Sequence, residues 1–194
     1  MPMDYVPTYE EFIEKAETLS DQECVEYCDE LISSKAHVGY AMLMKSGALI
    51  LLKKFEDAIK VCDKIIDLSD DRLTGSAYGN KGLSLTRLGK FTEALECHKK
   101  ESELGKTDKI HFVNVSFALG KLGKYEEALE NVEKALELDP NYATAWNNKG
   151  FDLHKMGKSE EGLKFVEKAL ELEPNHQDAI ESKQEILQAL GRTD

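Results

Sequence analysis

The segment WNNKGFDLHKMGK occupies residues 146–158, and two altered copies of it stand upstream at intervals of 34 residues. The copies are FVNVSFALGKLGK at residues 112–124 and YGNKGLSLTRLGK at residues 78–90. Self-similarity at a fixed period of this length is typical of chains in which one small structural unit is stacked many times. The sequence therefore predicts a repeat architecture.

Each copy is followed by a second helical stretch, such as YEEALENVEKALELDP at residues 125–140. Its apolar residues recur at steps of three and four, which places them on one stripe of a helix: Ala128, Leu129, Val132, Ala135 and Leu136. Gly123 stands in the short connection before this stretch, and Pro140 follows it and ends the helix. Each unit is thus predicted to be a pair of helices.

Small residues recur at two positions twelve residues apart, one in each helix of a pair, where close helix crossing requires them. The pairs are Gly82 with Ala94, Ser116 with Ala128, and Gly150 with Gly162.

These features resemble the tetratricopeptide-repeat (TPR) family, whose 34-residue pattern is matched in repeat 143–176. The matching residues are Trp146, Gly150, Leu153, Ala169 and Pro174. The same frame gives further repeats at 109–142, 75–108 and 39–72, a degenerate repeat at 5–38, and a capping helix at 177–191. The resemblance implies an all-α, right-handed superhelical solenoid that forms a single domain over residues 1–194.

Several residues depart from the family pattern, among them Glu101 and Lys106, which stand where alanine and proline are expected. Lys81 and Lys149 stand where the family usually has leucine, and we expect them to loosen local packing. Phe12 occupies the small-residue position of the degenerate repeat, so its helix pair is expected to be splayed.

Composition limits the classes of partner. The formal net charge is -12 and no dense run of lysine or arginine offsets it, which excludes nucleic acid and anionic membranes as expected partners. The longest apolar run, Ala48 to Leu52, is too short to span a bilayer, and no export signal is visible. Four irregularly spaced cysteines favour reduced thiols, so a cytoplasmic protein is expected.

The family resemblance implies that the first helices of the pairs line a concave groove that binds peptides. Three positions recur along that face at spacings of three and seven residues, which keeps them on one helical side. They form a set of amides, a set of apolar side chains and a set of cations: Asn80, Asn114 and Asn148; Leu83, Phe117 and Phe151; Arg87, Lys121 and Lys155. Such a groove suits an extended segment with apolar and acidic residues. The alternative is that duplication carried these residues along without a binding role.

Some family members bind acidic chaperone tails through a two-carboxylate clamp of lysines, asparagines and an arginine. The flanking clamp positions in this chain do not carry the cations: they are Leu43 and Gly47, or Gly79 and Leu83, with Ile110 and Asn114 or Thr144 and Asn148. We therefore expect no chaperone-tail clamp.

No spacing suggests a catalytic set, so the chain is predicted not to be an enzyme and to need no cofactor. Cys24 and Cys28 lie one helical turn apart, and Cys62, Cys97 and His98 fall near equivalent places in later helices. These residues lie on core stripes, where buried cysteine is common, so we expect no metal.

Two functional hypotheses remain. The first is a monomeric adaptor or scaffold that binds a protein or peptide in the groove. The second is a structural component that self-associates through its N-terminal helices, where Tyr5, Val6, Tyr9 and Phe12 are expected to be exposed.

Overall fold

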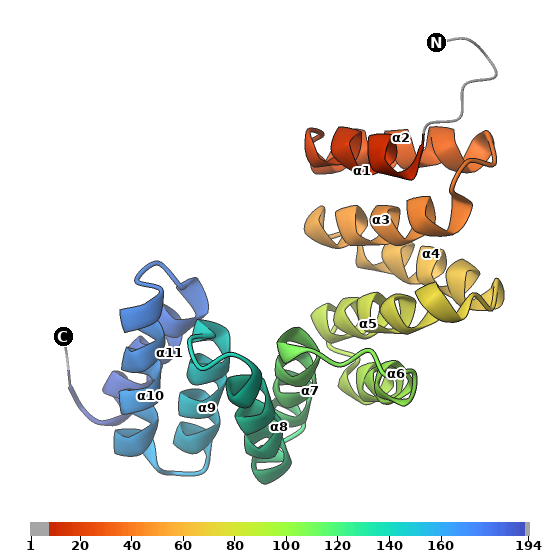
Figure 1. Cartoon of the computed structure of the whole chain (residues 1–194). Coiled ribbons are helices and arrows are strands. Elements are labelled where there is room, and N and C mark those ends of the chain that lie inside the picture. The colour runs from red at the N-terminus through yellow and green to blue at the C-terminus, as the bar shows by residue number, and fades with distance from the viewer. Residues whose placement is uncertain (1–7, 193–194) are drawn as a thin grey trace. The chain divides into compact units, whose positions relative to one another are not determined.

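The computed structural model describes residues 8–192, with the backbone only for Tyr9, and the regular structure in this part of the chain consists of eleven α-helices (Figure 1). In chain order they are α1 (Tyr9–Glu17), α2 (Asp21–Ser33), α3 (Val38–Leu51), α4 (Phe55–Asp67), α5 (Asp71–Arg87), α6 (Phe91–Glu103), α7 (Lys109–Lys121), α8 (Tyr125–Leu138), α9 (Ala143–Lys155), α10 (Ser159–Leu172) and α11 (Gln177–Ala189). The predicted all-α fold is confirmed. No helix within the described residues is both long and apolar enough to cross a membrane.

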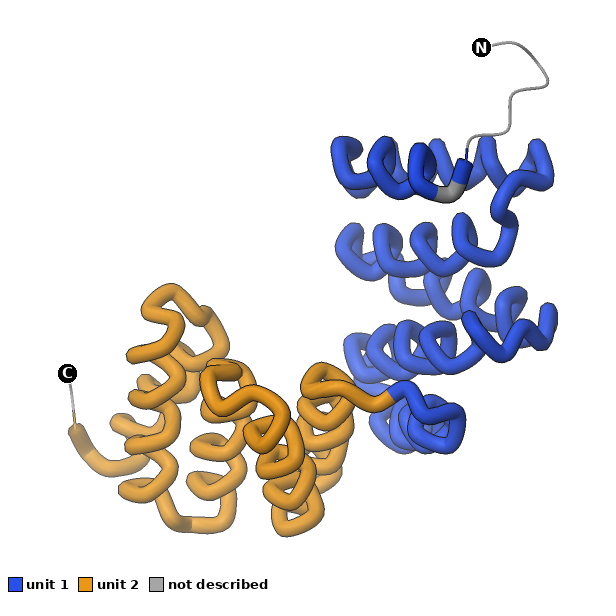
Figure 2. The backbone as a smooth tube through the Cα atoms, in the orientation of Figure 1, with its two compact units in different colours: residues 1–106 blue, residues 107–194 orange. Residues whose placement is uncertain are grey.

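The chain divides into two compact units (Figure 2). Unit 1 ends at Lys106 and unit 2 begins at Thr107, close to the predicted border between repeats 75–108 and 109–142. That residues 1–194 form a single domain stays a prediction.

Within each unit, the helices pack in the order expected of stacked helix pairs. In unit 1, α3 packs against α2, α4 and α5. In unit 2, α9 packs against its own partner α10, against α8, and against the first helices of the neighbouring pairs, α7 and α11. The first helices of successive pairs are therefore neighbours, which is the geometry that creates a common face in a repeat protein.

Glycine ends the first helix of a pair where the backbone must turn sharply. Gly123, between α7 and α8, has φ +76°, and the N–H of Lys124 then donates to the carbonyl of Leu119 at 3.0 Å. Gly89 and Gly157 adopt the same left-handed conformation, with φ of +76° and +83°. A residue with a Cβ would be strained in this conformation, which explains why glycine recurs at the turn that the sequence predicted.

The closest helix crossing lies between α9 and α10. A Cβ placed on Gly150 would lie 2.5 Å from the carbonyl oxygen of Gly162, so neither residue has room for a side chain. This confirms the predicted Gly150–Gly162 crossing. A Cβ added to Gly82 would lie 2.7 Å from the His98 ring on α6, and His98 is buried there. The predicted crossing of Gly82 with Ala94 stays a prediction.

Phe12 is buried, with 1% of its surface exposed. Its ring centroid lies 6.1 Å from that of Tyr27 and 6.1 Å from that of His37, with which it stacks. The expectation that Phe12 is exposed for self-association is therefore wrong, because its ring packs against Tyr27 and His37 in the core of unit 1. Tyr5 and Val6, and the side chain of Tyr9, lie outside the described residues.

Lys81 and Lys149 do not loosen the packing as expected. Each buries its stem and pairs with an acid on the second helix of the preceding repeat: Lys81 Nζ lies 2.5 Å from Asp63 Oδ1, and Lys149 Nζ lies 2.5 Å from Glu133 Oε1. The same register recurs in two other pairs, Lys45 with Asp29 and Lys183 with Glu167. At the position where the family usually has leucine, these lysines thus bury an aliphatic stem and pair their ammonium with a carboxylate.

Candidate functional site

The nine predicted groove residues lie on three first helices. Asn80, Leu83 and Arg87 are on α5 in unit 1; Asn114, Phe117 and Lys121 are on α7, and Asn148, Phe151 and Lys155 are on α9, in unit 2. Because α7 and α9 pack side by side, unit 2 brings its six residues onto neighbouring helices.

Two of the three asparagines take part in packing between repeats. The side-chain amide of Asn80 donates to the hydroxyl of Ser46 at 2.8 Å, and that of Asn148 donates to the hydroxyl of Ser116 at 3.2 Å. Both serines occupy the small-residue position of the preceding repeat. Asn148 is also buried, whereas Asn114 is half-buried. The amides of Asn80 and Asn148 are thus engaged by the protein itself.

The apolar and cationic residues of unit 2 form one cluster, called here the α7–α9 cluster: Phe117, Lys121, Phe151 and Lys155. Lys121 Nζ lies 5.1 Å from the ring centroid of Phe117 and 6.0 Å from that of Phe151. Lys155 Nζ lies 4.8 Å from the ring of Phe151. Both rings are half-buried, so the cluster presents aromatic edges beside positive charge.

The two cations of the cluster differ in their partners. Lys155 forms an ion pair with Glu185 of the capping helix α11, and the Nε2 atom of His154 lies 3.8 Å from the same carboxylate. Lys121 is exposed and forms no ion pair with any of the residues that the structure describes. The cluster therefore offers one cation, Lys121, to an incoming anionic group.

A buried carboxyl beside this cluster was not anticipated from the sequence. Asp152 on α9 is 5% exposed, and within the described residues its Oδ2 atom has no hydrogen-bond partner. Burial raises the pKa of this carboxyl to about 7, and the positive charge of Lys121 opposes the rise. The signal in the sequence was the residue type, because the equivalent positions in the other three full repeats are Ala48, Ser84 and Ala118.

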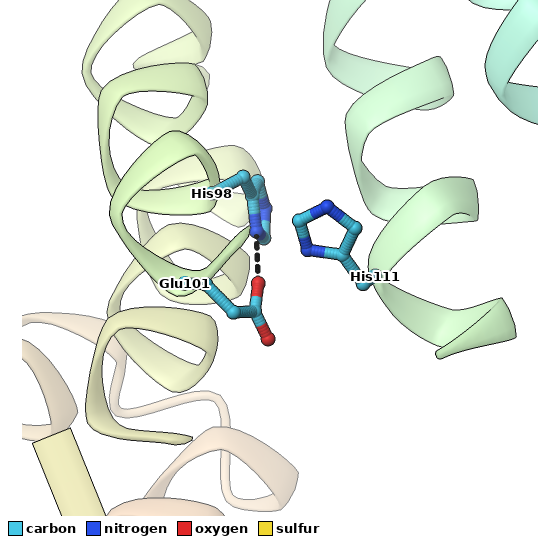
Figure 3. Close-up of side chains that lie close together, drawn as sticks. All are labelled: His98, Glu101 and His111. Carbon is cyan, nitrogen blue, oxygen red and sulfur yellow. Dashed lines mark hydrogen bonds and ion pairs between the residues drawn. The ribbon is translucent and has the colours of Figure 1, made fainter. Parts of the chain in front are cut away.

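The buried His98 and the half-buried Glu101 pair on α6 (Figure 3). The Nδ1 atom of His98 lies 2.9 Å from the Oε2 atom of Glu101, one turn further along the helix. His111, also drawn in Figure 3, is on α7 and belongs to unit 2. Sequence reasoning placed His98 on a core stripe, and the structure confirms its burial.

All four cysteines are buried free thiols. Burial raises the pKa of Cys28 to about 12 and that of Cys62 to about 11, so these thiols stay protonated at neutral pH. They behave as small core residues, as the sequence predicted for Cys24, Cys28, Cys62 and Cys97.

Two family models match the C-terminal half of the chain: one described as "TPR repeat" over residues 118–157, and one described as "Tetratricopeptide repeat" over residues 143–176. The second coincides with the repeat defined here from sequence. No curated protein matches the chain in sequence.

Solved structures resemble the fold over most of the chain. YrrB, described as a TPR protein with an unusual peptide-binding site, is 21% identical, covers 88% of this chain and 87% of its own, and gives a TM-score of 0.64. MamA 41-end from Desulfovibrio magneticus RS-1 is 19% identical, covers 86% and 95%, and gives 0.70. The first TPR of Spaghetti (RPAP3), bound to the HSP90 peptide SRMEEVD, is 29% identical, covers 60% and 93%, and gives 0.54.

Proposed function

The chain is a tetratricopeptide-repeat protein, and on that premise we propose that it is a protein-interaction scaffold that binds an extended segment of a partner along its first helices. The principal contact surface in unit 2 is the α7–α9 cluster together with the half-buried Asn114. The partner segment carries an apolar side chain next to a carboxylate. We also propose that the scaffold is a monomeric, cytoplasmic protein that has no catalytic activity of its own.

The observation that carries this proposal is the environment of Lys121. Its ammonium lies over two half-buried rings and has no carboxylate partner among the described residues. Cation–π contact orients the side chain, while the exposed ammonium can still donate hydrogen bonds to a carboxylate. The rings of Phe117 and Phe151 supply the apolar surface for a neighbouring aliphatic or aromatic side chain.

The comparisons support a peptide as the ligand class. A TPR domain that is 29% identical over 60% of this chain is solved with an acidic peptide, SRMEEVD. This chain lacks the flanking clamp cations, since Leu43 and Gly47 hold such positions in unit 1. We therefore propose a different recognition mode, in which apolar contacts to the rings accompany a single carboxylate contact at Lys121.

Unit 1 offers a related but sparser set. Leu83 is half-buried and Arg87 is exposed on α5, whereas Asn80 is bonded to Ser46. We propose that Leu83 and Arg87 are the residues of unit 1 that contact a partner. No observation favours the alternative of self-association through the N-terminal helices, because Phe12 is buried.

A displayed library of random peptides tests the proposal. The native protein should enrich peptides in which Asp or Glu adjoins a large apolar residue. Lys121→Gln and Phe117→Ala should each lower the affinity for a selected peptide about tenfold, the amount expected for loss of a contact worth about 1.4 kcal/mol. Lys164→Gln, which removes an exposed lysine of α10 from the same unit, is the matched control and should bind like the native protein.

Equal binding by the native protein and by both α7 variants would remove the α7–α9 cluster from the interface. Light scattering at increasing concentration tests the monomer, whose mass should stay near 21.8 kDa.

A further inference from the structure

Asp152 occupies space that the chain leaves open for it. A Cβ added to Gly120 on α7 would lie 2.6 Å from the Asp152 Oδ1 atom, so the carboxyl fills the volume of a side chain absent at residue 120. The contact joins two neighbouring first helices, α7 and α9, within unit 2. Any residue other than glycine at 120 would displace the carboxyl.

The residue types at these two positions are reversed relative to the other repeats. Where α9 has Asp152, the other three full repeats have Ala48, Ser84 and Ala118. Where α7 has Gly120, they have Ile50, Thr86 and His154. In unit 2, a buried carboxyl on α9 faces glycine on α7. Packing alone does not require a charge-bearing group in this position.

Among the described residues, the charges around the carboxyl are few. Lys121, which follows Gly120 on α7, is the charged group that acts on Asp152. On α9, His154 and Lys155 associate with Glu185 of α11. Lys149, also on α9, pairs with Glu133 of α8. No charged group of α8 or α10 perturbs the carboxyl. An ionised Asp152 therefore has Lys121 as its available counter-charge.

We propose that Asp152 is a proton-controlled switch for Lys121. When the carboxyl is neutral, it packs against Gly120, and Lys121 lies over the Phe117 and Phe151 rings, the arrangement seen in the structure. When the carboxyl is ionised, its unpartnered Oδ2 cannot stay buried without compensation, so it turns toward Lys121 and draws the ammonium off the rings.

The sign of the switch follows from burial. Because burial raises the pKa of Asp152 to about 7, the neutral form dominates below that pH and the ionised form above it. If the α7–α9 cluster binds an acidic segment, a consequence that rests on the proposed function, Lys121 is available to that segment at lower pH and is engaged by Asp152 at higher pH.

NMR titration of the free protein from pH 5.5 to 9 tests the switch without any ligand. The carboxyl carbon of Asp152 should titrate with a midpoint near 7, and the ring protons of Phe117 should shift with the same midpoint. Phe117 is the better reporter because the Phe151 ring also contacts a second ionisable side chain, with 6.2 Å between its centroid and that of the His154 ring. His154→Gln is the control and should leave the Phe117 titration unchanged.

Two variants make the test decisive. In the isosteric Asp152→Asn variant, the Phe117 shift near pH 7 should disappear. In Lys121→Met, the Asp152 carboxyl should still titrate, at a higher pH because a stabilising cation is gone, while the Phe117 response is lost. A Phe117 titration that persists in Asp152→Asn, or that the native protein lacks, would overturn the switch. An Asp152 midpoint unmoved by Lys121→Met would do the same.

Discussion

The side-chain amide of Asn148 on α9 donates a hydrogen bond to the hydroxyl of Ser116 on α7, with 3.2 Å between nitrogen and oxygen. The Ser116 hydroxyl in turn donates to the carbonyl of Val113 at 3.0 Å, so it remains bonded whether or not Asn148 is present. Asn80 and Ser46 form the corresponding bond in unit 1. A repeated asparagine on the first helix thus ties one repeat to the preceding one.

Replacing Asn148 by alanine should destabilise unit 2 even without a ligand. The loss should be about 1 to 2 kcal/mol, because one hydrogen bond between buried groups is removed and a small cavity is left. Urea unfolding followed by the fluorescence of Trp146, the single tryptophan and a residue of α9, measures it. The control is the same Asn148→Ala substitution made in the Ser116→Ala variant. If the stability losses of the two single variants add up to that of the double variant, the hydrogen bond does not contribute to stability.

The crossing of α9 and α10 should not tolerate a methyl group. Gly150→Ala should lower the free energy of unfolding by about 1 to 3 kcal/mol, because the new Cβ would meet the backbone carbonyl of Gly162. Gly47→Ala in α3 is the matched control, since nothing lies within 4 Å of its added Cβ. There the better helix propensity of alanine should raise stability by about 0.5 to 1 kcal/mol. Calorimetry that found the same sign for both would contradict this account.

The lysines at the family's leucine position should stabilise mainly through their stems. The Nζ atom of Lys149 lies 4.6 Å from the centroid of the Phe165 ring and 5.4 Å from that of the Trp146 ring, so the stem reaches this aromatic pair. Lys149→Met keeps the apolar volume and should cost less than about 1 kcal/mol, since a partly exposed ion pair contributes little. Lys149→Ala loses both the apolar stem and the ion pair, and should lower the free energy of unfolding by about 1 to 2 kcal/mol more than Lys149→Met does. Equal losses for the two variants in chemical unfolding would assign the effect to the charge.

Asp152 should make the stability of unit 2 depend on pH. Its pKa in the folded chain is raised from 3.8 to about 7, so the unfolded state loses this proton first as pH rises. The free energy of unfolding should therefore fall between about pH 4 and 7 and level off above, by up to about 4 kcal/mol at 1.36 kcal/mol per pKa unit.

Asp152→Asn should remove this slope, so that at pH 8 the variant is more stable than the native protein and near pH 4 the two are similar. Urea unfolding followed by Trp146 fluorescence at each pH measures the difference. Asp178→Asn, which removes an exposed carboxylate from the start of α11, is the control and should leave the slope in place. A native protein no more pH-dependent than Asp152→Asn would contradict the raised pKa.

The candidate site was only partly visible in the sequence. Spacing placed Phe117, Lys121, Phe151 and Lys155 on one face, and in the structure their side chains meet across α7 and α9. Spacing could not show that Glu185 pairs with Lys155, or that Asn148 is buried against Ser116. Those partners lie about one repeat away, and the family pattern records which residue types recur, not which atoms touch.

Residue spacing was enough to predict the all-α repeat fold, the glycine turns and the Gly150–Gly162 crossing. These follow from helical periodicity and from backbone sterics, which act within one helix pair and repeat with it. Tertiary structure alone decided which polar groups are compensated. Lys149 stands at an apolar position, and Glu133 lies within reach of its ammonium, whereas Asp152 is buried beside Gly120 with one oxygen that has no hydrogen-bond partner among the described residues. The energy of a charge depends on its surroundings in three dimensions, so residue type and spacing could not give it.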